Sequence, residues 1–214
     1  MPNAPEPPAA SPAEKILGAA GEVFAEQGYA GARVDEIARR AGVNKAMLYY
    51  HVGDKAELYS RVLDVFFQDL SGRLARAVES EGGPAERLAG LQAAFATTAV
   101  AFPPFPQIML REIAGGARHL PREVLAGMAR FIATTRQVIE DGRERGVFRR
   151  DVEPLVTHIL VVGSVFLAAN GLRLFDRLEE LGVEAPADKL QLTDIARSAS
   201  DIILHGITLQ GDPS

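Results

Sequence analysis

The fold of this chain is decided by residues 34–51, which read VDEIARRAGVNKAMLYYH. Apolar residues recur at helical spacing through residues 34–41, Gly42 interrupts the pattern, and residues 45–51 resume it. Ala38 is small enough for the point where two such helices cross, and Gly42 suits a tight turn that needs a positive φ. Two short helices joined in this way predict a helix-turn-helix.

Helical periodicity continues outward from this segment, and no alternating strand pattern of useful length occurs in the 214 residues. We therefore predict an all-α fold of about nine helices. Ser11 is the predicted cap of the first helix, with Pro12 in its first turn, and Asp151 is the predicted cap of the eighth. The first helix is predicted to end at Gly28, and the others to span Val34–Ala41, Lys45–His51, Lys55–Glu79, Ala85–Val100, Ile108–Ile113, Pro121–Arg145, Asp151–Leu181 and Asp188–Leu209.

Composition divides the chain into three parts. Residues 1–12 contain five prolines without apolar periodicity, which is typical of a disordered tail. Residues 13–60 would form a three-helix domain around the helix-turn-helix. Residues 61–210 would form a larger helical domain.

The second helix of a helix-turn-helix lies in the DNA major groove, with its first residues facing base edges. Asn44 can cap that helix, and Lys45 can donate to guanine O6 and N7. Ala46 and Met47 offer apolar contact suited to thymine methyl groups. The net charge is −5, but residues 33–55 hold five basic and three acidic residues, a local excess of +2. This distribution permits a nucleic-acid partner without indicating one.

These residues resemble the DNA-binding signature of the tetracycline-repressor (TetR/AcrR) family, without a gap, over roughly residues 14–60. The resemblance rests on Gly28-Tyr29, on residues 34–44 and on residues 48–58, LYYHVGDKAEL. It implies that Tyr49, His51 and Lys55 anchor the DNA backbone. The predicted DNA-binding residues are Arg33, Asn44, Lys45, Ala46, Met47, Tyr49, Tyr50, His51 and Lys55.

Some of these positions have a second interpretation. The family usually has Thr or Ser just before the second helix, where this chain has Ala32-Arg33, so Arg33 would replace a hydroxyl–phosphate contact with a charged one. Considered alone, Tyr49-Tyr50-His51 is also the pattern of a packed aromatic edge. Arg39-Arg40 is interpreted as a solvated helix face.

A helix-turn-helix protein gains affinity by binding two half-sites about 34 Å apart, which requires a dimer. The predicted eighth helix is apolar nearly all round and must be covered on both sides. The resemblance implies that the last two helices form a four-helix bundle with their copies; packing within one chain is the alternative. The candidate interface residues are Leu160, Ser164, Leu167, Gly171, Leu192, Ile195, Ala199, Ile202 and Gly206.

The middle helices would enclose an effector pocket, mostly apolar with a few polar groups that fix orientation. The candidate wall residues are Phe95, Phe102, Phe105, Met109, Arg111, Met128, Phe131, Phe166 and Asn170. Phenylalanines at helical spacing are also ordinary core residues, and His119 is interpreted as a surface or hinge residue. An apolar or aromatic effector is expected, and its identity is open.

Other classes of function find little support. The chain has no cysteine, and its four histidines (His51, His119, His158 and His205) are far apart, so neither a metal nor another cofactor is expected. No nucleophile elbow, phosphate loop or dinucleotide fingerprint occurs, so we do not expect an enzyme. The most apolar stretch, Ile159–Ala169, is too short to span a membrane, and no secretory signal precedes it, so a cytoplasmic location is expected.

The sequence thus predicts a homodimeric transcriptional regulator, a repressor that a small molecule releases from a palindromic operator. An enzyme and an all-α carrier or interaction module remain as rivals, and activation is as compatible with the sequence as repression. Removal of the charges of Lys45 and Lys55 would separate the classes, because neither rival depends on them.

Overall fold

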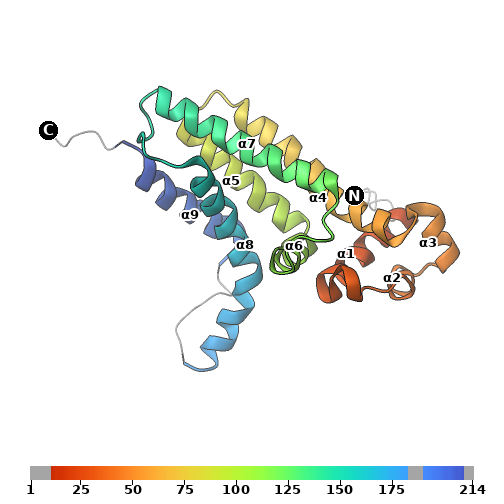
Figure 1. Cartoon of the computed structure of the whole chain (residues 1–214). Coiled ribbons are helices and arrows are strands. Elements are labelled where there is room, and N and C mark those ends of the chain that lie inside the picture. Colours follow the sequence, from red (N-terminus) through yellow and green to blue (C-terminus); the bar gives the residue numbers. More distant parts are fainter. Residues whose placement is uncertain (1–10, 183–189, 210–214) are drawn as a thin grey trace, which may run out of the picture. The chain divides into compact units, whose positions relative to one another are not determined.

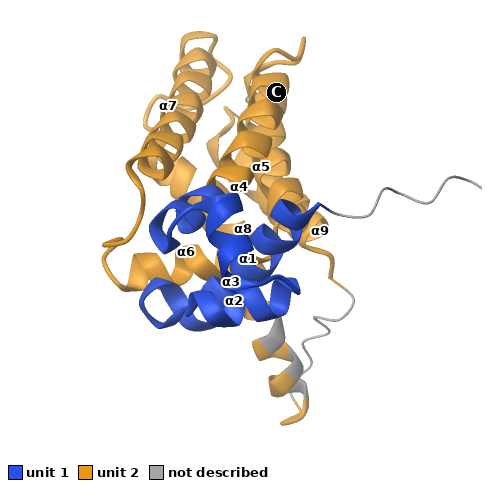
Figure 2. Cartoon of the chain, turned by 90° about the vertical axis from the view of Figure 1, so that its right-hand side faces the viewer, with its two compact units in different colours: residues 1–63 blue, residues 64–214 orange. Residues whose placement is uncertain are grey.

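The computed structural model describes residues 11–182 and 190–209. Nine helices and no strand form within these residues, which confirms the predicted all-α fold (Figure 1). The helices are α1 (Pro12–Gly31), α2 (Val34–Ala41), α3 (Lys45–Val52), α4 (Lys55–Val78), α5 (Pro84–Ala101), α6 (Pro104–Ala114), α7 (Arg122–Glu144), α8 (Pro154–Glu179) and α9 (Leu192–Ile207). The chain divides between Leu63 and Asp64, within α4, into two compact units, shown in blue and orange in Figure 2.

Unit 1 begins with a well-capped helix. The Ser11 hydroxyl accepts a hydrogen bond from the Glu14 N–H (3.3 Å), and the Glu14 carboxylate accepts one from the Ser11 N–H (2.7 Å). This reciprocal pair satisfies two N–H groups that a helix start leaves open, and Pro12 in the first turn has no N–H to satisfy. The predicted start of α1 is therefore confirmed. Gly28 interrupts the helix with a φ of +69°.

Aromatic packing forms the core of unit 1. The Phe24 ring meets the Tyr59 ring edge-on at 4.8 Å, and Tyr29 lies 4.9 Å from Tyr59. The fully buried aliphatic side chains around them come from α1, α2, α3 and α4; they include Ile16, Val23, Ile37, Leu48, Leu58 and Leu63. Burial of this apolar surface holds the short helices α2 and α3 in place.

Unit 2 is a helical bundle in which α5 packs against α7, α8 and α9, while α6 packs on α8. Phenylalanines from different helices meet inside it: Phe66 of α4 stacks on Phe105 of α6, and Phe95 of α5 contacts Phe131 of α7 at 5.7 Å. Backbone hydrogen bonds tie the α7–α8 connection to the end of α9, from the Arg149 N–H to the Ile207 carbonyl and from the Leu209 N–H to the Val147 carbonyl, both at 2.9 Å.

Three helix starts differ from the prediction by three residues or more, and proline explains two of them. α8 is capped by Glu153, whose carboxylate accepts from the Leu155 N–H at 3.4 Å, and not by Asp151. Pro154 favours the first helical position, which leaves the residue before it as the cap. α6 begins at Pro104, before the predicted Ile108, because proline is tolerated in a first turn. The third is α9, which begins at Leu192 with Gln191 as its N-cap, so the predicted helix is wrong at Leu190 and Gln191. The predicted start itself, Asp188, and the predicted tail up to residue 10 lie outside the described residues.

The apolar part of α8 is longer than the eleven residues that the sequence indicated. Pro154–Leu172 has a mean hydropathy of 1.9, so by length and composition alone it could cross a membrane, and 17% of it is buried. α8 is nevertheless one of the helices of the unit 2 bundle, packed against α5, α6, α7 and α9. Much of its apolar surface, including Ile159, Leu160 and Leu167, is exposed in the single chain.

Candidate nucleic-acid interface

The turn between α2 and α3 has the geometry that the sequence predicts. Gly42 adopts a left-handed conformation (φ +69°, ψ +30°), and the Val43 N–H donates to the Ala38 carbonyl at 3.0 Å. The Asn44 side chain then accepts a hydrogen bond from the Met47 N–H at 2.8 Å and caps α3. The reversal of the chain and the start of α3 are thus fixed by local hydrogen bonds.

α3 has one buried face and one exposed face. Leu48 and Val52 are 0% and 1% exposed, and they hold the helix on the core of unit 1. Met47, Tyr49 and Tyr50 are 41%, 44% and 85% exposed. Three large apolar or aromatic groups left in water together on one short helix are typical of a partner surface. The alternative, a packed aromatic edge, is not what the structure shows for Tyr50.

Lys45 and Asp35 form an ion pair across the two helices. The Lys45 ammonium lies 2.8 Å from a carboxylate oxygen of Asp35, and both side chains are more than half exposed, at 54% and 63%. The hydrogen bond from Lys45 lowers the pKa of Asp35 and raises the pKa of Lys45. Solvent screens an exposed pair of this kind, so it contributes little to folding.

Arg39 and Arg40 bind carboxylates of their own unit. Arg39 is 71% exposed and pairs with Glu36 at 2.7 Å, as a solvated helix face would. Arg40 is only 25% exposed and pairs with Glu36 on α2 at 2.8 Å and with Glu26 on α1 at 2.6 Å. Hydrogen bonds from Arg39 and Arg40 lower the pKa of Glu36 to about 2. Arg40 therefore braces α2 against α1, a role that sequence analysis missed.

The remaining predicted DNA-binding residues lie at helix ends of unit 1. Lys55 begins α4, and its ammonium lies over the Tyr29 ring at 4.8 Å and within 3.4 Å of the Ala30 carbonyl. Arg33 is exposed at the N-cap of α2 and makes no side-chain capping bond. His51, near the end of α3, is half-buried and lies edge-on to Tyr50, with ring centroids 5.3 Å apart.

The residues predicted to line a pocket are partly brought together. Phe95, Phe105, Met109 and Phe131 are buried in unit 2, and the Phe166 ring lies 5.4 Å from that of Phe95. Phe102, Met128 and Asn170 are half-buried, and Arg111 is exposed on α6. The Asn170 amide donates to the Phe166 carbonyl at 2.9 Å.

His158 joins this aromatic group, although sequence analysis gave it no role. The Thr135 hydroxyl donates to the Phe131 carbonyl (3.1 Å), so its oxygen accepts a hydrogen bond from Nδ1 of His158 (2.9 Å). Burial lowers the pKa of His158 to about 4, which leaves the ring neutral at pH 7. The only available signal was a histidine within an otherwise apolar helix.

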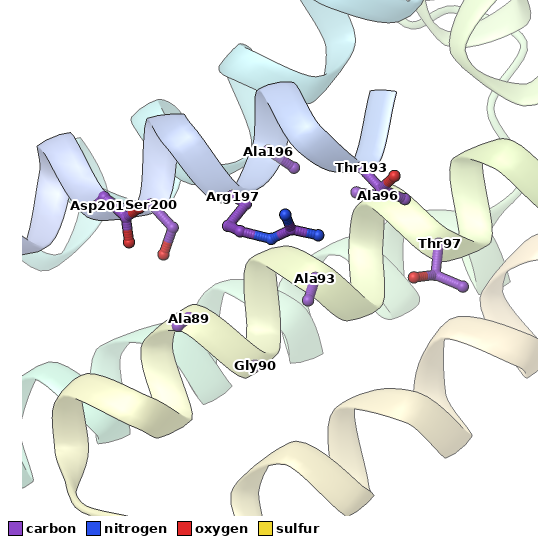
Figure 3. A pocket seen from close by; sticks show the side chains of 10 residues that line it. All are labelled: Ala89, Gly90, Ala93, Ala96, Thr97, Thr193, Ala196, Arg197, Ser200 and Asp201. Atoms are coloured by element: carbon purple, nitrogen blue, oxygen red, sulfur yellow. The ribbon is translucent and has the colours of Figure 1, made fainter. Parts of the chain in front are cut away.

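A cavity of about 490 Å³ lies elsewhere in unit 2, between α5 and α9 (Figure 3). None of the predicted wall residues lines it. Small side chains of α5 form one wall, and Arg197 of α9 extends between the two helices. Arg197 pairs with Asp194 at 3.3 Å. Among the described residues, no group of three acidic or histidine side chains is placed to hold a metal ion.

The predicted dimer residues fall on α8 and α9. Leu160, Leu167 and Ile202 are 50%, 76% and 75% exposed. The others are exposed or half-buried: Ser164, Gly171, Leu192, Ile195, Ala199 and Gly206. A contiguous exposed apolar surface of this kind is typical of protein–protein interfaces.

The matches to known families and proteins cover both units. Residues 16–62 match the family described as "Bacterial regulatory proteins, tetR family", and residues 84–199 match the "Tetracyclin repressor-like, C-terminal domain". The HTH-type transcriptional repressor NicS of Pseudomonas putida is 29% identical over 199 residues, which cover 91% of each chain.

A second relative is known in both sequence and structure. The HTH-type transcriptional repressor KstR2 of Mycobacterium tuberculosis is 26% identical over 202 residues, covering 92% of this chain and 93% of its own. The solved structure of the ketosteroid transcriptional regulator KstR2 of Mycobacterium tuberculosis gives a TM-score of 0.77 at 25% identity, and the match covers 94% of this chain and 97% of KstR2. By both domain matches and by these relatives, the chain belongs to the TetR family of helix-turn-helix transcriptional regulators.

Proposed function

We propose that this chain is a cytoplasmic, homodimeric repressor that binds a palindromic operator and is released from it by a small molecule. The observation that carries the proposal is the division of α3 into two faces. Leu48 and Val52 are buried in the core, and Lys45, Met47 and Tyr50 are exposed to solvent. Residues 13–60 would form the DNA-binding domain and residues 61–210 the domain for effector binding and dimerisation. The relatives that match over nine-tenths of this chain, NicS and KstR2, are named repressors and support repression, whereas FasR, which matches over 38% of it, is a named activator.

In this proposal the start of α3 meets base edges, while Arg33, Tyr49, His51 and Lys55 contact phosphates and fix the register. Half-sites about 34 Å apart require two copies of the chain. The exposed apolar faces of α8 and α9 support pairing through these helices, because a second copy would cover them.

The effector would bind among the aromatic side chains of unit 2, next to Phe95, Phe131 and Phe166. Because these side chains are apolar, we expect an apolar or aromatic compound. The neutral His158 ring would offer the effector a hydrogen-bond acceptor at Nε2, next to Phe131. An effector releases DNA only if it binds the DNA-free arrangement more tightly than the DNA-bound one.

Fluorescence anisotropy tests the proposed DNA-binding domain. The probe is DNA flanking the protein's own gene, and a scrambled fragment serves as competitor at two salt concentrations. The wild type should prefer the flanking DNA. Lys45→Ala, at a base-facing position, should reduce that preference, and Tyr49→Ala, at a phosphate-contacting position, should weaken binding to both fragments. Arg136→Ala is the matched control, because it also removes one exposed positive charge but lies on α7 of unit 2. Equal binding of the two fragments by a folded dimer would refute specific binding to this DNA.

Sedimentation tests the dimer. Leu167→Glu and Ile202→Glu place charges on the proposed interface and should give monomers with weaker DNA affinity. Leu110→Glu is the control, because Leu110 is 50% exposed on α6, outside the proposed interface. Dimers that survive both interface substitutions would place the pairing surface elsewhere.

A further inference from the structure

The ion pair between Asp35 and Lys45 joins the first turns of two helices. Asp35 is the second residue of α2, and Lys45 is the first residue of α3. Their charged atoms lie 2.8 Å apart, and each side chain is more than half exposed. The pair is therefore held together at the end of the helix that would enter the groove, with solvent around it and free hydrogen-bonding capacity on both partners.

The ammonium of Lys45 has three donors and no acceptor. Asp35 takes one donor, so two remain for DNA. Guanine is the base that presents two acceptors side by side in the major groove, O6 and N7. The carboxylate of Asp35 is acceptor-only and has further lone pairs, which suit the N4 amino group of cytosine.

The spacing of the pair also matches a G·C base pair. Guanine O6 and cytosine N4 are joined by a base-pairing hydrogen bond, so they lie about 2.9 Å apart. The Lys45 and Asp35 atoms that would face them are 2.8 Å apart. A donor and an acceptor on the protein can therefore meet an acceptor and a donor on the DNA at the same time.

We propose that Asp35 is a specificity-determining residue, and that it reads one G·C base pair of each half-site together with Lys45. The inference rests on the proposed DNA-binding function. An A·T base pair also offers an acceptor and a donor at this spacing, but it gives the ammonium one acceptor where guanine gives two: adenine N7 lies beside an amino group, and thymine O4 lies beside a methyl group. The ion pair also keeps the flexible ammonium of Lys45 near the base edges, and the negative charge of Asp35 disfavours the approach of phosphates.

The test measures base preference at every operator position. The full-length wild type, Asp35→Asn, Lys45→Ala and Glu22→Gln are each used to select from a DNA library randomised over one half-site. The selected pools are then sequenced. Glu22→Gln is the matched control: like Asp35→Asn it removes one exposed negative charge from unit 1, and it lies 3.9 Å from Arg40, away from Lys45.

Wild-type protein should prefer G·C at one position by about tenfold or more over other base pairs. Lys45→Ala should lose the preference at that position. Asp35→Asn keeps an oxygen acceptor but loses the charge, so it should reduce the preference about threefold at the same position while binding scrambled DNA slightly more tightly. Glu22→Gln should keep the wild-type preference. Urea unfolding of each variant establishes that it is folded.

Two results would overturn the assignment while leaving the DNA-binding function intact: an Asp35→Asn profile equal to that of Glu22→Gln, or a change at a position that Lys45→Ala does not affect. A wild-type protein that selects no sequence at all would overturn the proposed function itself, and the role of Asp35 with it.

Discussion

Replacement of Gly42 by alanine isolates the cost of the turn between α2 and α3. Gly42 has a φ of +69°, and a Cβ placed on it would have no atom within 4 Å. The substitution therefore creates no steric clash with the rest of the protein, and its whole cost is local backbone strain. A left-handed conformation costs an L-residue about 1–2 kcal/mol. Part of this cost is offset because alanine also restricts the unfolded chain, so we expect a net loss of about 1 kcal/mol.

Urea unfolding followed by circular dichroism measures the effect. Gly18→Ala is the control with the opposite sign: Gly18 lies in an ordinary helical stretch of α1, again with nothing within 4 Å of an added Cβ. That variant should gain up to about 1 kcal/mol. Gly42→Asn should lose less than Gly42→Ala, because asparagine tolerates positive φ.

The DNA dissociation constant of folded Gly42→Ala should stay within about twofold of the wild-type value, since no contacting side chain changes. The reasoning is refuted if Gly42→Ala stabilises the protein as Gly18→Ala does. A loss above about 3 kcal/mol would equally refute it, because backbone strain alone does not account for so much.

Three further substitutions test other features. Arg33→Thr supplies the side-chain cap that α2 lacks and should raise stability by about 1 kcal/mol, seen as a higher urea midpoint. Gly142→Ala places a Cβ into the ring of buried Phe148 and should cost about 1–3 kcal/mol; an unchanged midpoint would contradict this packing. Burial lowers the pKa of His158 from 6.5 to about 4, so the unfolded chain takes up its proton first as the pH falls. The contribution of neutral His158 should be present above pH 6.5 and lost towards pH 4, by up to about 2 kcal/mol after allowance for partial exposure. His158→Gln, compared with wild type across this range, should lack that part of the pH dependence.

The features that could be predicted from the sequence depend on interactions between residues close together in the chain. Gly42, Asn44 and Ser11 each act on backbone groups within a few residues, so their roles follow from spacing alone. The same reasoning failed at Asp151, because Asp and Glu can both cap a helix and the nearby Pro154 decided between them. The start of a helix can thus be predicted from the sequence where only one nearby residue is suited to cap it.

Contacts between distant residues were not predictable in the same way. Arg40 looks like a surface arginine in the sequence, and its pairing with Glu26, fourteen residues earlier, depends on how α1 and α2 cross. The link from His158 to Thr135 likewise needs the packing of α8 on α7. The cavity beside Arg197 arises from small residues of two helices far apart in the chain, and no single motif marks it.

The brace at Arg40 has a consequence for how ionic strength acts on this protein. Added salt displaces protein from DNA by competing for phosphates, and the slope of log affinity against log salt is commonly converted into a number of phosphate contacts. Here the same ions also screen the pairing of Arg40 with Glu26 and Glu36 within unit 1. The slope will then combine loss of phosphate contacts with loosening of the protein itself, and a contact number taken from it will come out too high.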